Sequence, residues 1–188
     1  NKPVMHELSL HILDIVENST GAGADKVTLT VEEDSGRDEL RICIVDNGRG
    51  MDAAMVASVL DPFVTTRTTR KVGLGLPLME MTTGMCGGHL TVESEPGVGT
   101  KVEATWQHSH LDRPPLGNML TTLKTILVMN PDLHFQYFHR VDGKTFLLDS
   151  VEIRNALGDL PLTHPEVLDW LNGYLKENLS ILYGGSEK

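Results

Sequence analysis

Two polar residues near the start of the chain, Asp14 and Asn18, lie four positions apart within an apolar repeat. On a helix this spacing places both side chains on one face. An asparagine at the polar edge of an apolar helix needs a partner, and its amide oxygen can ligate a hydrated magnesium ion. A carboxylate one turn away can accept a proton, or it can belong to a solvated helix face. The pair is therefore compatible with a polar site that holds a metal ion.

A basic, glycine-ending segment occupies residues 61–76. Arg67, Arg70 and Lys71 form a local cluster of positive charge in a chain whose net charge is −10. Such cations can neutralise a polyphosphate, although each one alone could equally be a solvated loop residue. Gly73 and Gly75 precede a predicted helix, whose N-terminal amides can meet phosphate oxygens. The segment therefore favours a phosphate-binding loop.

The elements that must position these residues follow from periodicity and from Gly and Pro breaks. Apolar residues at helical or alternating spacing divide the chain at a polar, proline-containing linker over 107–115. We predict an N-terminal domain over 1–108 and a C-terminal α/β extension over 109–188. The final helix is expected to begin at Thr163 as its N-cap, with Glu166 three residues later. Predicted helices cover 5–20, 53–60, 76–85, 116–129, 150–157 and 163–182, and predicted strands cover 27–31, 40–45, 89–94, 100–106, 133–140 and 144–148.

Composition limits the function classes. The 188 residues carry a net charge of −10, which disfavours binding to nucleic acid or to anionic membranes. Cys43 lies in an apolar run and Cys86 beside two glycines, so neither a disulfide framework nor a metal site is expected. No signal peptide or membrane-length apolar run is present. These features predict a globular cytoplasmic protein.

Four segments, at 13–24, 46–51, 61–76 and 97–102, occur in an order that resembles the four boxes of the GHKL superfamily of gyrase, Hsp90, histidine-kinase and MutL ATPases. The third segment is the most specific and is similar to the lid of histidine kinases. The resemblance covers about 100 residues. It implies an α/β (α+β) two-layer sandwich of the Bergerat type, with a mixed or antiparallel sheet covered by helices on one face. A P-loop is absent from the sequence.

The resemblance implies a role for each box. Asn18 would ligate Mg²⁺, Asp46 would accept a hydrogen bond from the adenine amine of ATP, and the Thr100 hydroxyl would support Asp46, often through water. Asp14 stands where many relatives have a catalytic Glu, and its carboxylate is retracted by about 1 Å. Glu17 is an alternative base, but it lies about 100° around the helix from Asn18.

The remaining implied nucleotide-binding residues share two properties: they come from the glycine boxes or from the lid. The glycines let the backbone approach the ligand without a Cβ clash, and Phe63 would pack at the lid hinge. These residues are Gly48, Gly50, Met51, Phe63, Arg67, Arg70, Lys71, Gly73, Leu74, Gly75 and Leu76.

Two functions are compatible with these boxes. One is a protein kinase similar to histidine kinases or anti-sigma kinases, which transfers the γ-phosphoryl group of ATP to His or Ser/Thr of a partner protein. Few residues precede the first box, so the phosphoacceptor is expected on a separate protein. The other is a nucleotide-gated interaction module with slow or no hydrolysis. The extension can bind a partner, mediate homodimerisation or cover the ATP domain.

Overall fold

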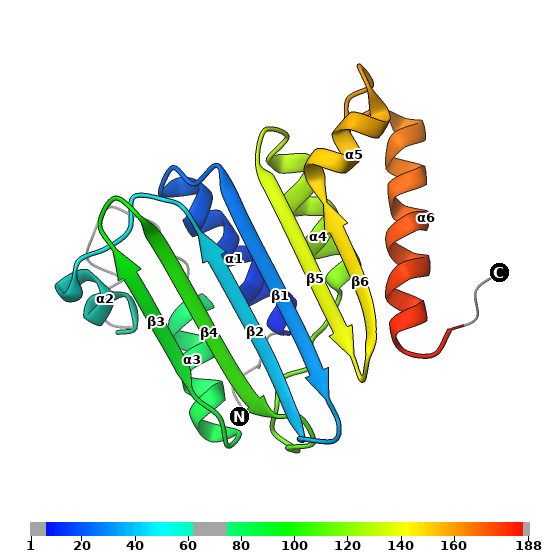
Figure 1. Ribbon diagram of the computed structural model, residues 1–188. Helices are drawn as coiled ribbons and strands as arrows, with labels where there is room; N and C mark the ends of the chain where they lie inside the picture. Colours follow the sequence, from blue (N-terminus) through cyan, green and yellow to red (C-terminus); the bar gives the residue numbers. More distant parts are fainter. Residues whose placement is uncertain (1–6, 62–74, 186–188) are drawn as a thin grey trace, which may run out of the picture.

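The chain forms a six-stranded mixed sheet covered by helices (Figure 1); the computed structural model describes residues 7–61 and 75–185. The strands lie in the order β3-β4-β2-β1-β5-β6. Their bounds are β1 Lys26–Asp34, β2 Glu39–Asp46, β3 Leu90–Glu95, β4 Gly99–Gln107, β5 His134–Val141 and β6 Lys144–Asp149. The helices are α1 Leu8–Gly21, α2 Ala53–Val59, α3 Gly75–Met85, α4 Met119–Met129, α5 Ser150–Leu157 and α6 Pro165–Leu182.

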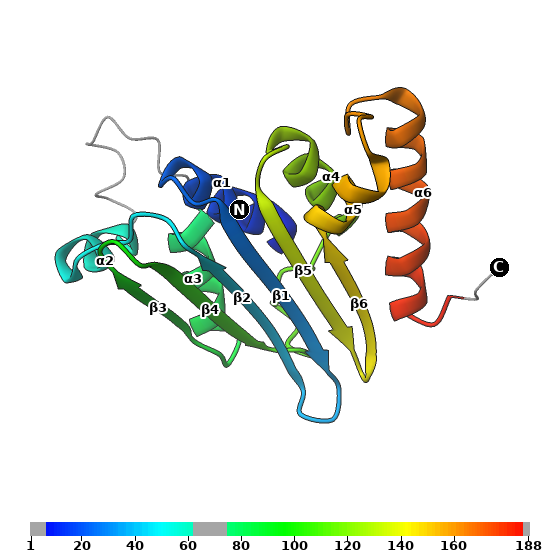
Figure 2. The same cartoon turned by 45° about the horizontal axis from the view of Figure 1, so that its top comes forward.

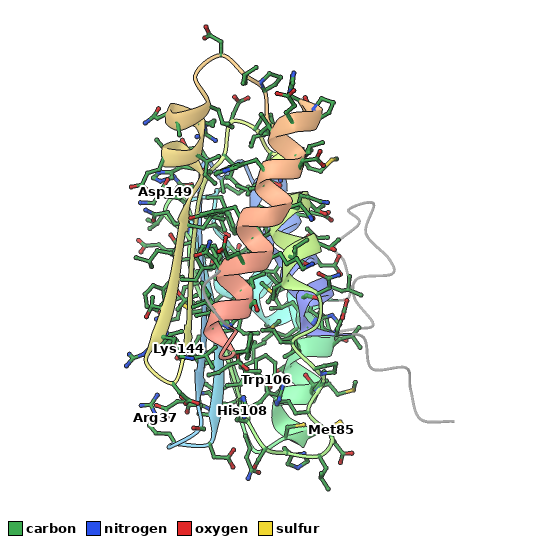
Figure 3. All side chains as sticks on the ribbon, turned by 90° about the vertical axis from the view of Figure 1, so that its right-hand side faces the viewer. Arg37, Met85, Trp106, His108, Lys144 and Asp149 are labelled. Carbon is green, nitrogen blue, oxygen red and sulfur yellow. The ribbon has the colours of Figure 1, made fainter. Side chains whose placement is uncertain are left out.

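The predicted two-layer architecture is confirmed. β1 pairs with β5 in parallel and with β2 antiparallel, and the other neighbouring pairs are antiparallel, so the sheet is mixed. Helices α1, α3 and α4 lie side by side behind the strands (Figures 1 and 2). Seen from the side, α6 lies in the same helical layer, while α5 continues from the end of β6 (Figure 3).

Alternation of side chains along the strands explains why only one face takes helices. In β1, Val27, Leu29 and Val31 are buried, and the residues between them are half-buried. Because successive strand residues point to opposite faces, the apolar set forms a layer against which α1 packs. The buried stripe of α1 includes Ile12 and Ile15. Burial of this apolar surface is the main force that joins the two layers.

The C-terminal extension continues the sheet of the N-terminal domain. β5 lies beside β1, with Leu29 opposite Tyr137. The linker also holds the start of α1, because the amides of Leu8 and Ser9 donate to the carbonyls of Pro115 and Leu116 at 2.9 and 2.8 Å. The division at residue 108 stays a prediction about independent folding, but the strands on its two sides form one sheet and share one hydrophobic core.

A partly buried polar cluster ties the two parts together at the end of β1. The Glu33 cluster consists of Glu33, His108, Tyr137, His139 and Tyr183. The Glu33 carboxylate accepts hydrogen bonds from Nε2 of His139 at 3.0 Å, from Nε2 of His108 at 3.2 Å and from the Tyr183 hydroxyl. The Tyr137 hydroxyl lies 2.6 Å from Nδ1 of His139. His108, labelled in Figure 3, lies near the C-terminal end of α6.

Opposing effects set the pKa of Glu33. Its exposure is 8%, and burial alone raises the pKa of a carboxyl group. The hydrogen bonds from His139, Tyr183 and His108 outweigh burial and lower the pKa of Glu33 from 4.5 to about 2. The cluster therefore holds an ionised carboxylate in the joint between the linker, β5 and the end of α6.

One predicted helix start is wrong. The N-cap of α6 is His164, without a side-chain cap hydrogen bond, and Thr163 lies outside the helix. Pro165 occupies the first helical position, where its fixed φ favours the helix and its missing N–H costs no hydrogen bond. The sequence pattern of Thr163 and Glu166 resembles a capping box, but the proline sets the boundary one residue later.

Candidate functional site

Three donors from different elements hold the Asp46 carboxylate at the end of β2. Its Oδ1 accepts from the amides of Gly48 and Thr100 at 2.9 and 3.2 Å. Its Oδ2 accepts from the Ser19 hydroxyl of α1 at 2.6 Å. Asp46 is half-buried. Because the donors fix its orientation, the carboxylate is a preorganised acceptor at the edge where α1 ends and β4 begins (Figure 1, upper left).

Glycines bring the loops around Asp46 into close contact. Gly50 and Gly99 have φ values of +69° and +143°, which favour glycine. A Cβ on Gly50 would lie 1.9 Å from the Glu95 carbonyl oxygen, and one on Gly99 would lie 2.0 Å from that of Asp46. A side chain at either position therefore requires the backbone to move. The glycines pack the two loops against each other beside the carboxylate.

Thr100 contacts Asp46 through its backbone amide, and its hydroxyl lies 2.8 Å from the Ser94 hydroxyl. Support of Asp46 by this hydroxyl through water stays a prediction. Ser94 Oγ also accepts from the Met51 amide at 2.8 Å and donates to the Gly99 carbonyl at 3.1 Å. The hydroxyl of Thr100 is thus directed to the neighbouring strand β3, because Ser94 is its direct cross-strand partner. Ser94 joins the loop that contains Met51 to the start of β4.

The predicted catalytic and metal-binding residues share one side of α1. Asp14 and Asn18 are half-buried, whereas Glu17 is exposed, as expected from its different direction around the helix. Within residues 7–61 and 75–185, the Asn18 side chain has no protein hydrogen-bond partner. A half-buried amide without a protein partner fits the role of an oxygen ligand for Mg²⁺.

Asp14 lies against the first residue of α3. A Cβ on Gly75 would stand 2.9 Å from the Asp14 Cβ and 3.2 Å from its Oδ2. Gly75 and Leu76 are buried, so the helix that follows the predicted lid starts directly beside the carboxylate. The absence of a side chain at Gly75 permits this approach. The carboxylate therefore sits at the positive end of α3.

Six predicted site residues lie outside the described ranges of 7–61 and 75–185. They are the lid residues Phe63, Arg67, Arg70, Lys71, Gly73 and Leu74. The structure brings together Asp46, Gly48, Gly50, Met51 and Thr100 at one edge of the sheet.

Two residues of the site were not predicted. Ser19 lies next to Asn18 and is 3% exposed, but the sequence motifs indicate no role for it. Its position four residues after Ile15 places it on the buried stripe of α1, and a hydroxyl there needs a partner. A serine on the buried stripe of a helix therefore indicates that a polar group lies opposite its hydroxyl. Ser94 carries no such signal, because it stands in an ordinary alternating strand.

Comparison with known proteins identifies the class of fold and site. Residues 4–110 match the family model "Histidine kinase-, DNA gyrase B-, and HSP90-like ATPase". Because the match covers more than half of the chain, the protein belongs to this family, and the predicted GHKL resemblance is confirmed. The matched region contains the Asp46 carboxylate, its glycine loops and α1.

Two curated relatives are named as kinases. The chain is 39% identical over 89 residues to Sensor protein kinase FleS of Pseudomonas aeruginosa, which covers 47% of this chain and 22% of that protein. It is 32% identical over 94 residues to Sporulation kinase D of Bacillus subtilis, which covers 50% of this chain and 18% of that protein. The chain thus spans less than a quarter of the length of either relative.

The fold also has a solved counterpart that includes the extension. The N-terminal domain of a DNA repair protein aligns with 95% of this chain and 57% of that chain, at a TM-score of 0.53 and 17% identity. The alignment reaches beyond the family match into the region of β5, β6 and α6. In the ranges 7–61 and 75–185, no helix has both the length and the apolar composition needed to cross a membrane.

Proposed function

We propose that the Asp46 site binds ATP with Mg²⁺ and that the bound nucleotide is the phosphoryl donor of a protein kinase. The observation that carries the proposal is the Asp46 carboxylate, fixed by Ser19, Gly48 and Thr100 at the rim of a glycine-lined edge. The donors occupy positions on both carboxylate oxygens. Remaining lone-pair positions of the carboxylate can accept the exocyclic amine of adenine.

The other end of the nucleotide is assigned to α1 and to the lid. Asn18 would hold Mg²⁺, which supplies charge neutralisation on the phosphate oxygens when bound. Arg67, Arg70 and Lys71 of the lid would add positive charge around the polyphosphate. Two adjacent residues at the end of α1 would thus serve different parts of the nucleotide. Ser19 would orient the Asp46 carboxylate that recognises adenine, and Asn18 would hold the metal ion at the phosphates.

Phosphoryl transfer then needs little covalent participation from the protein. A nitrogen or oxygen nucleophile of a partner protein forms a bond to the γ-phosphorus, and the bond to the β–γ bridging oxygen breaks to release ADP. Asp14 accepts or orients the nucleophile's proton. Asp14 is half-buried beside Gly75. Because it lies four residues before Asn18, both side chains are on the same side of α1. Positioning of the reactants would supply most of the rate.

One observation favours a nucleotide-gated interaction module as the second candidate. The Asp14 carboxylate is one methylene shorter than a glutamate and packs against the start of α3. A carboxylate retracted in this way reaches a nucleophile less well, which favours binding without phosphoryl transfer. In this alternative, ATP would change the affinity for a partner without transfer of phosphate.

Incubation of the chain with γ-labelled ATP and Mg²⁺, together with proteins that co-purify with it, separates the two functions. The kinase predicts label on a partner, acid-labile if the acceptor is His and acid-stable if it is Ser or Thr. Asp46→Asn should abolish the label. If no partner is labelled while ATP still changes which proteins co-purify, the kinase proposal is wrong and the module remains.

A further inference from the structure

A cavity lies at the opposite end of β1 from the Asp46 site. It occupies the space between the start of α4 and the end of α6 and has a volume of about 390 Å³. This size is within the range of small-molecule pockets. Its walls are mainly aliphatic and come from Leu116, Met119 and Leu120 on one side and Leu179 on the other. An occupant would therefore bury an apolar body.

Among the described residues, the deep part of this cavity offers no unpaired polar atom to a ligand. His139 is fully buried beneath the cavity and Tyr183, which is 58% exposed, lies at its edge, but both belong to the Glu33 cluster. The two His139 ring nitrogens face Tyr137 and Glu33 at 2.6 and 3.0 Å, and the Tyr183 hydroxyl donates to Glu33. Since these polar atoms already have partners, the deep part of the cavity suits hydrocarbon.

The rim contributed by α6 has a different character. Lys176 and Ser180 are one helical turn apart, both are exposed, and both line the cavity. Across the described part of the chain, the Lys176 ammonium makes no ion pair, and the Ser180 hydroxyl has no hydrogen-bond partner. A free ammonium and a free hydroxyl on one helix face match the oxygens of a carboxylate.

We propose that this cavity binds a small aliphatic monocarboxylic acid. The hydrocarbon body packs between Leu120 and Leu179, while the carboxylate pairs with Lys176 and accepts a hydrogen bond from Ser180. No bond is made or broken. The proposal is independent of the nucleotide site, because it uses no residue of that site.

Hydrogen bonds link one wall of the cavity to the first residues of α1. The 115–118 segment borders the cavity and also accepts the amides of Leu8 and Ser9 through the carbonyls of Pro115 and Leu116. The Asn118 amide in turn donates to the Glu7 carboxylate at 3.2 Å. Movement of this segment on ligand binding should therefore be visible at the first residues of α1.

The test is a titration of the full chain with octanoate, followed by ¹⁵N–¹H NMR. Saturable shifts are expected for 116–120 and 176–183, with smaller shifts at Leu8 and Ser9. Acetate lacks the apolar body and should give none. 1-Octanol lacks the charge and should bind roughly fivefold more weakly, the size of effect expected for one partly exposed ion pair.

Matched lysine variants test the charged rim. Lys176→Gln should weaken octanoate roughly fivefold and leave 1-octanol unchanged, whereas Lys124→Gln, on α4 and outside the cavity lining, should change neither. The proposal is overturned if octanoate gives no saturable shifts up to about 1 mM, if the shifts map elsewhere, or if Lys176→Gln binds octanoate as tightly as the unaltered chain.

Discussion

Substitution of Glu33 by Gln should destabilise the fold in a pH-dependent way. The pKa of Glu33 is lowered from 4.5 to about 2, because hydrogen bonds from His139, Tyr183 and His108 outweigh the effect of burial. One pKa unit corresponds to about 1.4 kcal/mol, so the ionised carboxylate stabilises the folded state by about 3 kcal/mol at pH 7. Gln cannot ionise and should lose that contribution.

The sign of the pH effect follows from the lowered pKa. Above pH 4.5 the carboxylate is ionised in both states and its stabilisation is complete. As the pH falls from 4.5 toward 2, the unfolded chain takes up a proton before the folded chain does, so the stabilisation is lost. The difference between the original chain and Glu33→Gln should shrink from about 3 kcal/mol at pH 7 to about 1 kcal/mol at pH 3.

Urea unfolding followed by tryptophan fluorescence measures this difference, because Trp106 is only 1% exposed in the folded chain. Glu32→Gln is the matched control: Glu32 is the neighbouring residue and forms a half-buried ion pair with Arg41 at 3.2 Å, which should contribute about 0–1 kcal/mol. Two results would contradict a stabilising role for the Glu33 carboxylate. One is that Glu33→Gln lowers the free energy of unfolding at pH 7 no more than Glu32→Gln does. The other is that Glu33→Gln lowers it equally at pH 7 and pH 3.

Three further substitutions test the nucleotide site. Ser19→Ala removes the 2.6 Å donor to Asp46 and should weaken ATP binding roughly tenfold by calorimetry; unchanged affinity would show that the hydroxyl does not orient the carboxylate. Gly99→Ala places a Cβ 2.0 Å from the Asp46 carbonyl oxygen and should lower the thermal unfolding midpoint, whereas Gly97→Ala, whose Cβ meets nothing within 4 Å, should lower it less. Asn18→Ala should remove the Mg²⁺ dependence of ATP binding, and a variant that keeps this dependence would refute Asn18 as a metal ligand.

Much of the secondary structure could be predicted because each element carries its own periodicity. The predicted helix over 150–157 coincides with α5. The break between the predicted strands 133–140 and 144–148 contains a turn at Asp142 and Gly143, with φ values of 48° and 94°. Such local patterns depend on residues close in sequence. The fold class followed from the GHKL resemblance, which specifies how the elements are arranged.

The place of the extension in the sheet could not be predicted. β1 and β5 are about a hundred residues apart, and Lys26 lies opposite His134. Periodicity says which face of each strand is buried, but it does not say which strands are neighbours. For the same reason the Glu33 cluster could not be predicted: its members come from β1, the linker, β5 and the residue after α6.

The sequence indicated Asp46 and its glycine loops, but it did not indicate the groups that donate hydrogen bonds to the Asp46 carboxylate. The assignment of Asp46 and the glycines rests on the resemblance, because a loop of that composition is by itself also a common turn. The hydroxyl of Ser19 and the amide of Thr100 are fixed by the three-dimensional approach of α1 and β4 to the end of β2. Residue type alone does not distinguish an amide contact from a hydroxyl contact at Thr100.

Calorimetric titration of ATP and Mg²⁺ into the full chain and its Asp46→Asn variant tests the central claim most directly. The amide of Asn would present a donor or a weaker acceptor to the adenine amine, so the variant should bind ATP at least about a hundredfold more weakly. Asp34→Asn, at the far end of β1, should bind ATP like the unaltered chain. Equal ATP affinity for Asp46→Asn and the unaltered chain would contradict the assignment of the site.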